Sequence, residues 1–195
     1  MTGVIILAAG SSSRLGKPKQ NLIFQGQTLL QRAIQNALAS GCENVVLVLG
    51  ANAEAIQNTL TDQAVPVIYN PDWEEGMASS IRLGLTELQK QLPGLTSAIL
   101  MLCDQPFAEA AIINQLIQKK SATQKSIIAS AYDGTIGSPA LFDKVHFDEL
   151  LQLTGNEGAK KLLIKYADEV ATIPFLLGAI DIDTIGDYER LEEGF

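Results

Sequence analysis

Short apolar segments alternate with longer amphipathic segments along this chain, and this alternation limits the possible folds more than any other feature. The first apolar segment, Val4-Ile5-Ile6-Leu7, is continuous and β-branched, which is typical of a strand buried on both faces. Alternating strands and helices indicate a mostly parallel sheet with helices on both faces and right-handed crossovers. The segment 97–102 is the most apolar, so we expect it at the centre of the sheet.

Capping and turn residues indicate where the predicted helices begin and end. Thr28 is a candidate N-cap for the first helix, which stops near Gly41, and Asp183 or Thr184 for the last helix. The expected strands cover residues 3–7, 44–49, 65–69, 97–102, 126–131, 138–142, 170–173 and 179–182. The expected helices cover residues 28–39, 53–60, 78–90, 109–119, 147–153, 157–166 and 184–192.

Glycine, serine and basic residues follow the first strand directly, in a segment that we call the phosphate loop (residues 10–19). It contains three serines and the cations Arg14, Lys17 and Lys19. Backbone N–H groups that turn inward in such a loop form a concave site of partial positive charge. Ligands of α/β folds bind at the carboxyl ends of strands. The loop therefore predicts a site for a di- or triphosphate, the alternative being a polar surface loop.

Two other phosphate-binding motifs do not fit this loop. A P-loop has four residues between its glycines and a Ser or Thr after its lysine. Here five residues separate Gly10 from Gly16, and Pro18 occupies the place of the hydroxyl residue. The dinucleotide-binding pattern G-x-G-x-x-G is also missing from the sequence.

Asp104 follows the apolar strand 97–102 and is a candidate metal ligand. A carboxylate at the end of a buried strand is desolvated unless a cation or a hydrogen-bond donor meets it. Mg²⁺ is a suitable partner, because it accepts one or two carboxylates and keeps water and phosphate oxygens as its other ligands. The alternative is a turn or capping acid, since Asp before Gln105-Pro106 often begins a turn.

Asp181-Ile182-Asp183 places two further carboxylates near the end of the chain. Alternate residues of a strand face the same way, so both could point at one metal ion. The alternative role for Asp183 is to cap the last helix. We expect Asp183 rather than Asp181 to be the second metal contact.

Composition excludes several classes of protein. The chain of 195 residues is long enough for one sizeable core, and we treat residues 1–195 as a single domain. Its 22 acidic and 14 basic residues give a net charge of −8, which argues against nucleic acid as a partner. No apolar stretch suits a membrane span and no basic signal-peptide start is present, so we expect a cytoplasmic protein. We also expect a monomer rather than an obligate oligomer.

Cys42 and Cys103 are expected to be buried thiols, and His146 a surface residue.

The phosphate loop also resembles the signature of a known family. The segment Leu7-Ala8-Ala9-Gly10-Ser11-Ser12-Ser13-Arg14-Leu15-Gly16-Lys17-Pro18-Lys19 resembles the signature of the MobA-like nucleotidyltransferases. Within this family it is most similar to the molybdenum-cofactor cytidylyltransferases. Each short motif is weak alone, but several in the family's order are specific. The other similar segments are Asn70-Pro71-Asp72-Trp73-Glu74-Glu75-Gly76-Met77-Ala78-Ser79-Ser80-Ile81-Arg82, Leu102-Cys103-Asp104-Gln105-Pro106, Gly137-Ser138-Pro139-Ala140-Leu141-Phe142, Gly155-Asn156-Glu157-Gly158-Ala159-Lys160 and Asp181-Ile182-Asp183-Thr184.

The resemblance implies a three-layer, Rossmann-like nucleotidyltransferase fold with Mg²⁺ as the cofactor. It implies that Arg14, Lys19 and Asp104 are catalytic and that Asp104 and Asp183 hold the metal. The implied nucleotide-binding residues are Leu7, Ala8, Ala9, Gly10, Ser11, Ser12, Arg14, Lys19, Gly76, Ser79, Ser80 and Asp104. The implied acceptor-binding residues are Gly137, Ser138, Pro139, Asn156 and Lys160.

The acceptor segments depart from the family pattern. Asn156 and Lys160 stand where the family usually has Asp and Arg, and Ser138 stands where His or Asn is common. Lysine keeps the positive charge of arginine but loses its two-pronged phosphate contact. Trp73 and Tyr69 are expected to be packing residues rather than stacking platforms for a base.

The implied function is transfer of CMP from CTP, or from another NTP, to the phosphate of a molybdopterin-type acceptor, with a molybdoenzyme as a further possible partner. One alternative is a guanylyltransferase or a sugar-phosphate nucleotidylyltransferase of the same fold. An alternative of another class is a nucleotide-binding chaperone or regulator that loads the cofactor without chemistry. Turnover with each NTP separates the transferases from one another, and pyrophosphate release separates an enzyme from the chaperone.

Overall fold

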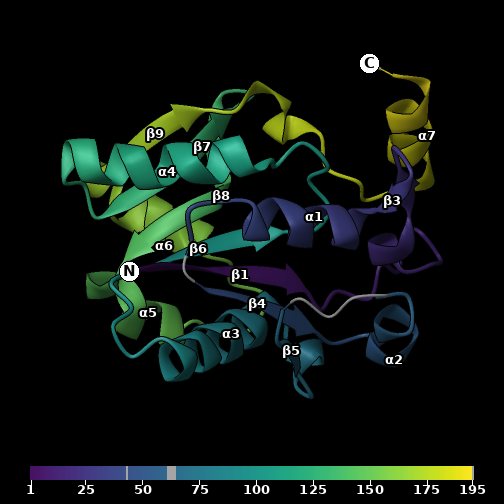
Figure 1. Ribbon diagram of the computed structural model, residues 1–195, viewed down its shortest axis with the longest axis horizontal. Coiled ribbons are helices and arrows are strands. Elements are labelled where there is room, and N and C mark those ends of the chain that lie inside the picture. Colours follow the sequence, from purple (N-terminus) through teal and green to yellow (C-terminus); the bar gives the residue numbers. More distant parts are fainter. Residues whose placement is uncertain (43, 61–64, 195) are drawn as a thin grey trace.

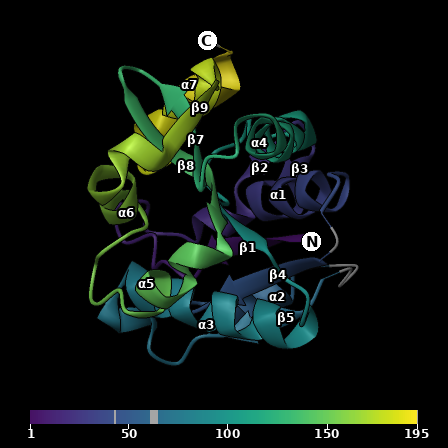
Figure 2. The same ribbon diagram turned by 90° about the vertical axis from the view of Figure 1, so that its left-hand side faces the viewer.

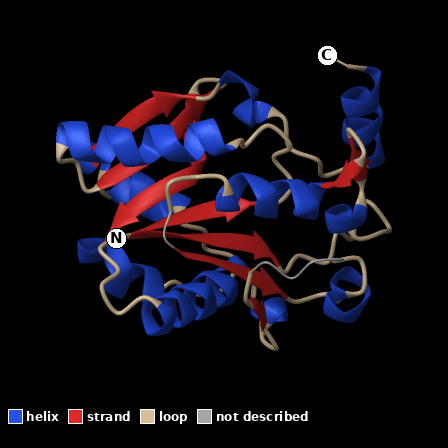
Figure 3. Ribbon diagram, in the orientation of Figure 1, coloured by secondary structure: helices blue, strands red, loops and turns tan. Residues whose placement is uncertain are grey.

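A sheet runs through the middle of the molecule, and helices cover both of its faces (Figure 1, Figure 3). The computed structural model describes residues 1–42, 44–60 and 65–194, and in these residues the main sheet has seven strands. Their order is β5-β4-β1-β6-β8-β7-β9, so the apolar strand β6 is central, as predicted. The strands are β1 (Thr2–Ala8), β4 (Asn44–Leu49), β5 (Val67–Tyr69), β6 (Ser97–Leu102), β7 (Ile127–Tyr132), β8 (Thr135–Asp143) and β9 (Val170–Pro174).

The sheet is mostly parallel, as predicted, and β8 supplies its antiparallel part. β8 runs antiparallel to both of its neighbours, β6 and β7, whereas β1 is parallel to β4 and β6, β4 to β5, and β7 to β9. β7 and β8 are joined by Asp133 and Gly134, which have φ of 46° and 70°. A two-residue turn with positive φ matches the twist of a hairpin, and Asp-Gly is a preferred sequence for it. The expected strand 138–142 is therefore part of a longer strand.

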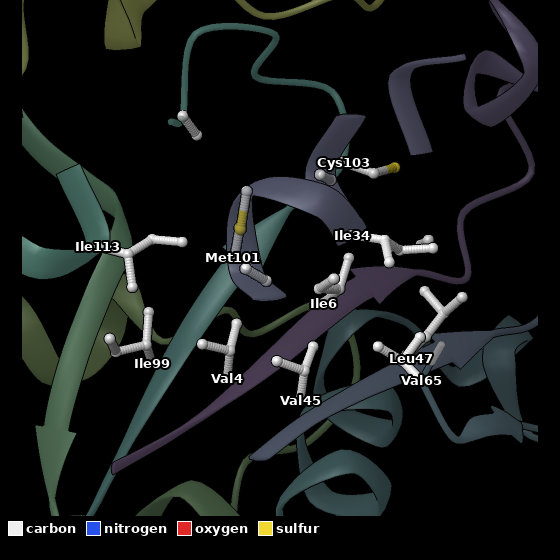
Figure 4. Packing of buried hydrophobic residues seen from close by; sticks show 14 of the residues in the cluster. Val4, Ile6, Ile34, Val45, Leu47, Val65, Ile99, Met101, Cys103 and Ile113 are labelled. Carbon is white, nitrogen blue, oxygen red and sulfur yellow. The ribbon is translucent and has the colours of Figure 1, made fainter. Parts of the chain in front are cut away.

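Alternating residues of β1 point into two separate cores. Val4 and Ile6 pack with α1 (Leu29–Leu38) and α4 (Ala110–Thr123), and Figure 4 shows them beside neighbouring strand residues in this core. Ile5 and Leu7 pack with α3 (Met77–Gln91), α5 (Phe147–Leu151) and α6 (Lys160–Lys165) on the opposite face. Figure 2 shows α1 and α4 on one side of the sheet and α3 and α5 on the other. The expected three layers are confirmed.

The C-terminal helix α7 (Ile185–Glu193) lies at one end of the molecule, and Thr184 caps it. Thr184 Oγ1 accepts a hydrogen bond from the N–H group of Asp187 (3.2 Å). Thr28 caps α1 in the same way, as predicted, by accepting from the N–H group of Gln31 (3.0 Å). Because Thr184 makes the cap of α7, the Asp183 carboxylate is left for other partners.

Two local features differ from the sequence predictions. Residues 179–182 do not form the expected strand: a 3-10 helix covers Leu176–Ala179, and the N–H group of Ile182 donates to the Asp104 carbonyl (3.1 Å). β9 forms this edge of the sheet, so the segment crosses the end of β6 instead of pairing beside it. A short hairpin of β2 (Ile23–Phe24) and β3 (Gln27–Thr28), which was not expected, precedes α1.

One histidine and two cysteines also test the sequence predictions. His146 is buried, not exposed as expected, because its Nε2 meets Ser126 Oγ (2.8 Å) and its ring packs on Tyr166. Cys103 is a buried thiol, and burial raises its pKa to about 12, whereas Cys42 is only half-buried. Among the described residues, none of the helices has the length and apolar character to cross a membrane.

Candidate functional site

The phosphate loop begins where β1 ends and lies at the same sheet edge as Asp104. β1 and β6 are parallel neighbours, so both chain segments leave the sheet at the carboxyl edge. Ser12 has φ of 55°, and its carbonyl accepts from the N–H group of Leu15 (3.0 Å). Ser12 Oγ accepts from the N–H group of Lys19 (3.0 Å). The loop thus folds back so that Lys19 is directed toward the strand ends.

Lys19 joins the two predicted metal-binding carboxylates. Its Nζ donates to Asp104 Oδ2 and to Asp183 Oδ1 (3.1 Å). Arg14 Nη2 donates to Asp183 Oδ2 (2.8 Å). The Arg14 side chain is 69% exposed, whereas those of Lys19 and Asp104 are only 17% and 12% exposed. The three predicted catalytic residues and Asp183 therefore form one charged network, which is buried at Lys19 and open to solvent at Arg14.

Lys19 remains positively charged in this network. Burial alone lowers the pKa of Lys19, but the Asp104 charge and hydrogen bond, with a smaller contribution from Asp183, outweigh burial and raise it. A fixed ammonium at the edge of a pocket suits the binding of an anionic group.

One carboxylate oxygen of this network is available to a metal ion. Asp104 Oδ1 is buried and has no hydrogen-bond partner, which is an unfavourable state that a cation relieves. Among the described residues, no group of three or more His, Cys, Asp or Glu side chains could hold a metal. Two carboxylates plus phosphate oxygens and water are the ligand set that Mg²⁺ prefers. Asp104 and Asp183 therefore fit a metal that binds together with a phosphate ligand.

Asp181 differs from Asp183 in its surroundings. It is exposed at the surface, whereas Asp183 is half-buried and paired with both cations. Partial burial and the charges of Asp104 and Asp183 raise the pKa of Asp181. Asp183, unlike Asp181, is therefore part of the charged network with Lys19 and Arg14.

A pocket of about 410 Å³ lies between the phosphate loop and the start of α3. Ser12, Arg14 and Ser79 are absent from its walls. Ser79 Oγ instead donates to the Gly76 carbonyl (2.8 Å) and accepts from Asn70 Nδ2 (2.8 Å). The predicted nucleotide-binding residues that line the pocket are Leu7, Ala8, Ala9, Gly10, Ser11, Lys19, Gly76, Ser80 and Asp104.

Aromatic and amide residues near this pocket include some that the sequence did not single out. Trp73 lines the pocket and also packs against Gly50, where any Cβ would lie 2.5 Å from the Trp73 Cβ. Tyr69 is 57% exposed at the end of edge strand β5, so its expected packing role is wrong. Asn70 is buried and holds both Ser79 and Ser80 by their hydroxyls. Its place before the Pro71 turn was the signal available in the sequence.

A second pocket of about 300 Å³ lies beside β8 and shares Leu7, Met77, Leu102 and Asn156 with the first. Most of its other walls are apolar side chains of β6, β8, α3 and α6. The predicted acceptor-binding residues that line it are Gly137, Ser138, Asn156 and Lys160, whereas Pro139 does not line it.

Tyr132 also faces this second pocket, and the sequence gave no signal for it. Its hydroxyl lies so close to the Cα of Gly137 that a Cβ at Gly137 would collide with it. Burial raises the pKa of Tyr132, so its hydroxyl is protonated at neutral pH. The phenol therefore offers a hydrogen-bond donor inside a largely apolar pocket.

Glu75 and Arg82 link the start of α3 to the chain segment that contains Asn156. Arg82 donates to both carboxylate oxygens of Glu75 (2.8 and 2.6 Å) and to the Leu153 carbonyl (2.6 Å). Glu75 Oε1 also accepts from the N–H group of Gly155 (3.3 Å). Gly76 has φ of 120°, and a Cβ there would lie 2.5 Å from Asn156 Oδ1. The start of α3 and the Asn156 turn thus form one rigid wall between the pockets.

Comparisons with known proteins agree on one family. The model of the MobA-like NTP transferase domain matches residues 4–170. The molybdenum cofactor cytidylyltransferase of Escherichia coli is 27% identical over 195 residues, which cover 98% of this chain and 95% of that protein. The nicotine blue oxidoreductase of Paenarthrobacter nicotinovorans is 33% identical over 147 residues, which cover 75% of this chain and 68% of that protein.

Solved structures have a similar fold. The crystal structure of Rv0371c from Mycobacterium tuberculosis superimposes with a TM-score of 0.87 and 32% identity, covering 99% of this chain and 97% of that chain. A structure of Rv0371c in complex with manganese has a TM-score of 0.82 and 30% identity, and the match covers 100% of this chain and 98% of that chain.

Proposed function

Because this chain belongs to the MobA-like NTP transferase family, we propose that it transfers CMP from CTP to the phosphate of a molybdopterin-type acceptor. The observation that carries this proposal is the Lys19 ammonium, which bridges two carboxylates at the mouth of a pocket walled by the phosphate loop. Nucleotidyl transfer depends on positioning and charge neutralisation rather than on a covalent protein group, and this site supplies both.

In the proposed reaction, an oxygen of the acceptor phosphate attacks the α-phosphorus of CTP. The bond between the α-phosphorus and the oxygen that bridges to the β-phosphate breaks, and its electron pair leaves with pyrophosphate. The N–H groups of residues 10–12 and the side chains of Lys19 and Arg14 hold the triphosphate. Lys19 moves its hydrogen bonds from the carboxylates to phosphate oxygens as the nucleotide enters, at no loss of charge pairing.

Asp104 and Asp183 would hold Mg²⁺ against this triphosphate. The ion, when bound, supplies positive charge to the α-phosphate and to the leaving pyrophosphate. Asp104 would offer the metal its unpartnered Oδ1, and its Oδ2 would also be available once Lys19 pairs with the phosphates.

The second pocket is the proposed acceptor site. Its apolar walls suit a flat heterocycle, and Ser138, Asn156 and Tyr132 offer hydrogen bonds at its edges. Lys160 would hold the acceptor phosphate as a point charge, since it has only one Thr135 hydroxyl (3.2 Å) as a hydrogen-bond partner in the described chain. We further propose that the cytosine dinucleotide product passes to a molybdoenzyme.

The test is pyrophosphate release with CTP, GTP, ATP and UTP, with and without Mg²⁺. Each NTP is tested with molybdopterin, with glucose 1-phosphate and with no acceptor. We expect release with CTP and molybdopterin together, and a product whose mass equals molybdopterin plus CMP. Release with GTP instead would identify a guanylyltransferase. Release only with a sugar phosphate such as glucose 1-phosphate would identify a nucleotidylyltransferase for sugars. Tight CTP binding without release for any acceptor would favour a non-catalytic chaperone.

A further inference from the structure

Gln20 is a fully buried polar residue that the proposed reaction does not use. It lies in the 3-10 helix Lys19–Asn21, directly after the lysine of the phosphate loop, and its side chain is 0% exposed. Its Nε2 donates to the carbonyl of Ala8 (2.8 Å) and to the carbonyl of Gly10 (3.2 Å). Its Oε1 accepts from Ser12 Oγ (3.4 Å). These partners lie at the end of β1 and at the start of the phosphate loop.

With one further hydrogen bond, these contacts engage every carbonyl group from residue 8 to residue 10 with a donor of the protein. The carbonyl between them, that of Ala9, accepts from the N–H group of Ala51 (3.0 Å). Three successive carbonyl groups, those of residues 8–10, are therefore held by donors of the protein. In the described parts of the chain, by contrast, the N–H groups of residues 10–12 donate to no protein acceptor. A loop whose carbonyls are tied inward presents its N–H groups to an anion.

We propose that Gln20 is a positioning residue for the phosphate loop. It keeps the carbonyl oxygens of Ala8 and Gly10 away from the pocket. The N–H group of Ser11, which shares a peptide unit with the Gly10 carbonyl, thereby stays available to phosphate oxygens. Without the two amide donors, these peptide groups are free to rotate and present oxygens to the phosphates, which repel them. The proposal rests on the proposed function only in taking the ligand as a triphosphate.

The first test is calorimetric binding of inorganic tripolyphosphate, with Mg²⁺ present, to the wild-type chain and to Gln20→Met. Methionine keeps the length of glutamine but has no donor, so we expect binding to weaken roughly tenfold or more. Gln20→Glu keeps the shape and adds acceptor oxygens opposite the same carbonyls, so its affinity should fall further than that of Gln20→Met. Equal losses for both variants, or no loss, would contradict a role for the amide donors.

Gln31→Met is the matched control. Gln31 also uses its side-chain amide structurally, since it completes the capping box of α1 and donates to the Thr59 carbonyl (3.3 Å). This variant should lower the melting temperature and leave tripolyphosphate binding unchanged. If Gln20→Met likewise lowers only the melting temperature, Gln20 has a packing role and the proposal is wrong.

A measurement on the wild-type chain covers the case in which the Gln20 variants do not fold. Hydrogen exchange followed by NMR should show slow exchange of the Gln20 side-chain amide with and without tripolyphosphate. The backbone N–H groups of residues 10–12 should exchange slowly only after tripolyphosphate is added. Rapid exchange of the Gln20 amide, or unchanged exchange at residues 10–12, would overturn the proposal. These results do not depend on CTP, so they remain interpretable if transfer of CMP is not observed.

Discussion

The pocket at the phosphate loop and the pocket beside β8 share four wall residues but present different groups to a ligand. The first has a charged network of Lys19, Asp104 and Asp183 at its mouth, held by hydrogen bonds within the protein. The second has mainly apolar walls, with Lys160 at its exposed rim. A pocket with fixed charges selects a chemical group such as a triphosphate, whereas an apolar pocket selects mainly by shape. Under the proposed function, we therefore expect the first pocket, the nucleotide half, to take a ligand common to many proteins, and the second pocket, the acceptor half, to take a particular one.

Among all variants, Asp104→Asn at the first pocket should lower the rate of nucleotidyl transfer the most. Asparagine keeps the shape of Asp104 but supplies no charge to the metal, so turnover should fall on the order of 10³-fold or more. The measurement is the rate of pyrophosphate release at saturating CTP and Mg²⁺, with circular dichroism to check the fold. A variant with near-normal turnover would mean that Asp104 is not a metal ligand.

Lys19→Met should come next, with a larger effect than Arg14→Met. Lys19 is mostly buried and joins two carboxylates, so loss of its charge-assisted hydrogen bonds should weaken CTP binding by roughly 1.5–3 kcal/mol. Arg14 is mostly exposed, and solvent screens its contribution to about 1 kcal/mol or less. Titration with CTP and with cytidine separates the effects, because only CTP binding should respond. Equal losses for CTP and cytidine would show that these side chains do not face the phosphates.

The sequence brings the phosphate loop and Asp104 together more directly than it predicts the contacts around the second pocket, and the reason lies in chain geometry. The phosphate loop and Asp104 each follow a strand of one parallel sheet, so the strand pattern alone brings them to one edge. The Glu75–Arg82 pair acts through Leu153 and Gly155, which lie far along the chain, and Tyr132 faces its pocket only when the β7–β8 hairpin has formed.

The errors have similar physical causes. The segment 179–182 has an apolar pattern, but it crosses the end of β6 and hydrogen-bonds to Asp104 rather than extending the sheet. His146 is buried because Ser126 and Tyr166 meet its ring, and neither contact can be read from its neighbours in sequence. Gln20 was missed because a glutamine in a polar loop resembles a surface residue until its carbonyl partners are seen.

Lys160→Met tests the acceptor half alone. If Lys160 holds the acceptor phosphate as a point charge, its loss should raise the KM for the acceptor by about tenfold and leave the KM for CTP unchanged. Lys160→Arg should preserve or improve acceptor use, because a guanidinium binds phosphate with two parallel hydrogen bonds. Combining it with Asn156→Asp restores both residues usual in the family and should also preserve turnover. Loss of turnover in the double variant would point to an acceptor other than molybdopterin.

The smallest expected effect concerns the stability of the fold and comes from His146, which is buried against Ser126 and Tyr166. Burial lowers the pKa of His146 below its usual 6.5, and nearby acidic residues offset this only in part. The unfolded chain therefore takes up a proton near pH 6.5 while the folded chain does not, so stability is full above this pH and is lost as the pH falls below it. Thermal melts between pH 7.5 and 5.5 should show a small decrease that His146→Gln removes. The same decrease in the variant would assign it to another group.

The most direct test of nucleotidyl transfer follows the phosphorus atoms of CTP. The wild-type chain is incubated with molybdopterin, Mg²⁺ and CTP labelled at either the α- or the γ-phosphorus, and the products are separated. We expect the α-label in the pterin product and the γ-label in pyrophosphate, with neither transfer in Asp104→Asn. Label from the γ-phosphorus in the acceptor, or no transfer of the α-label with any acceptor while CTP stays bound, would contradict nucleotidyl transfer at this site.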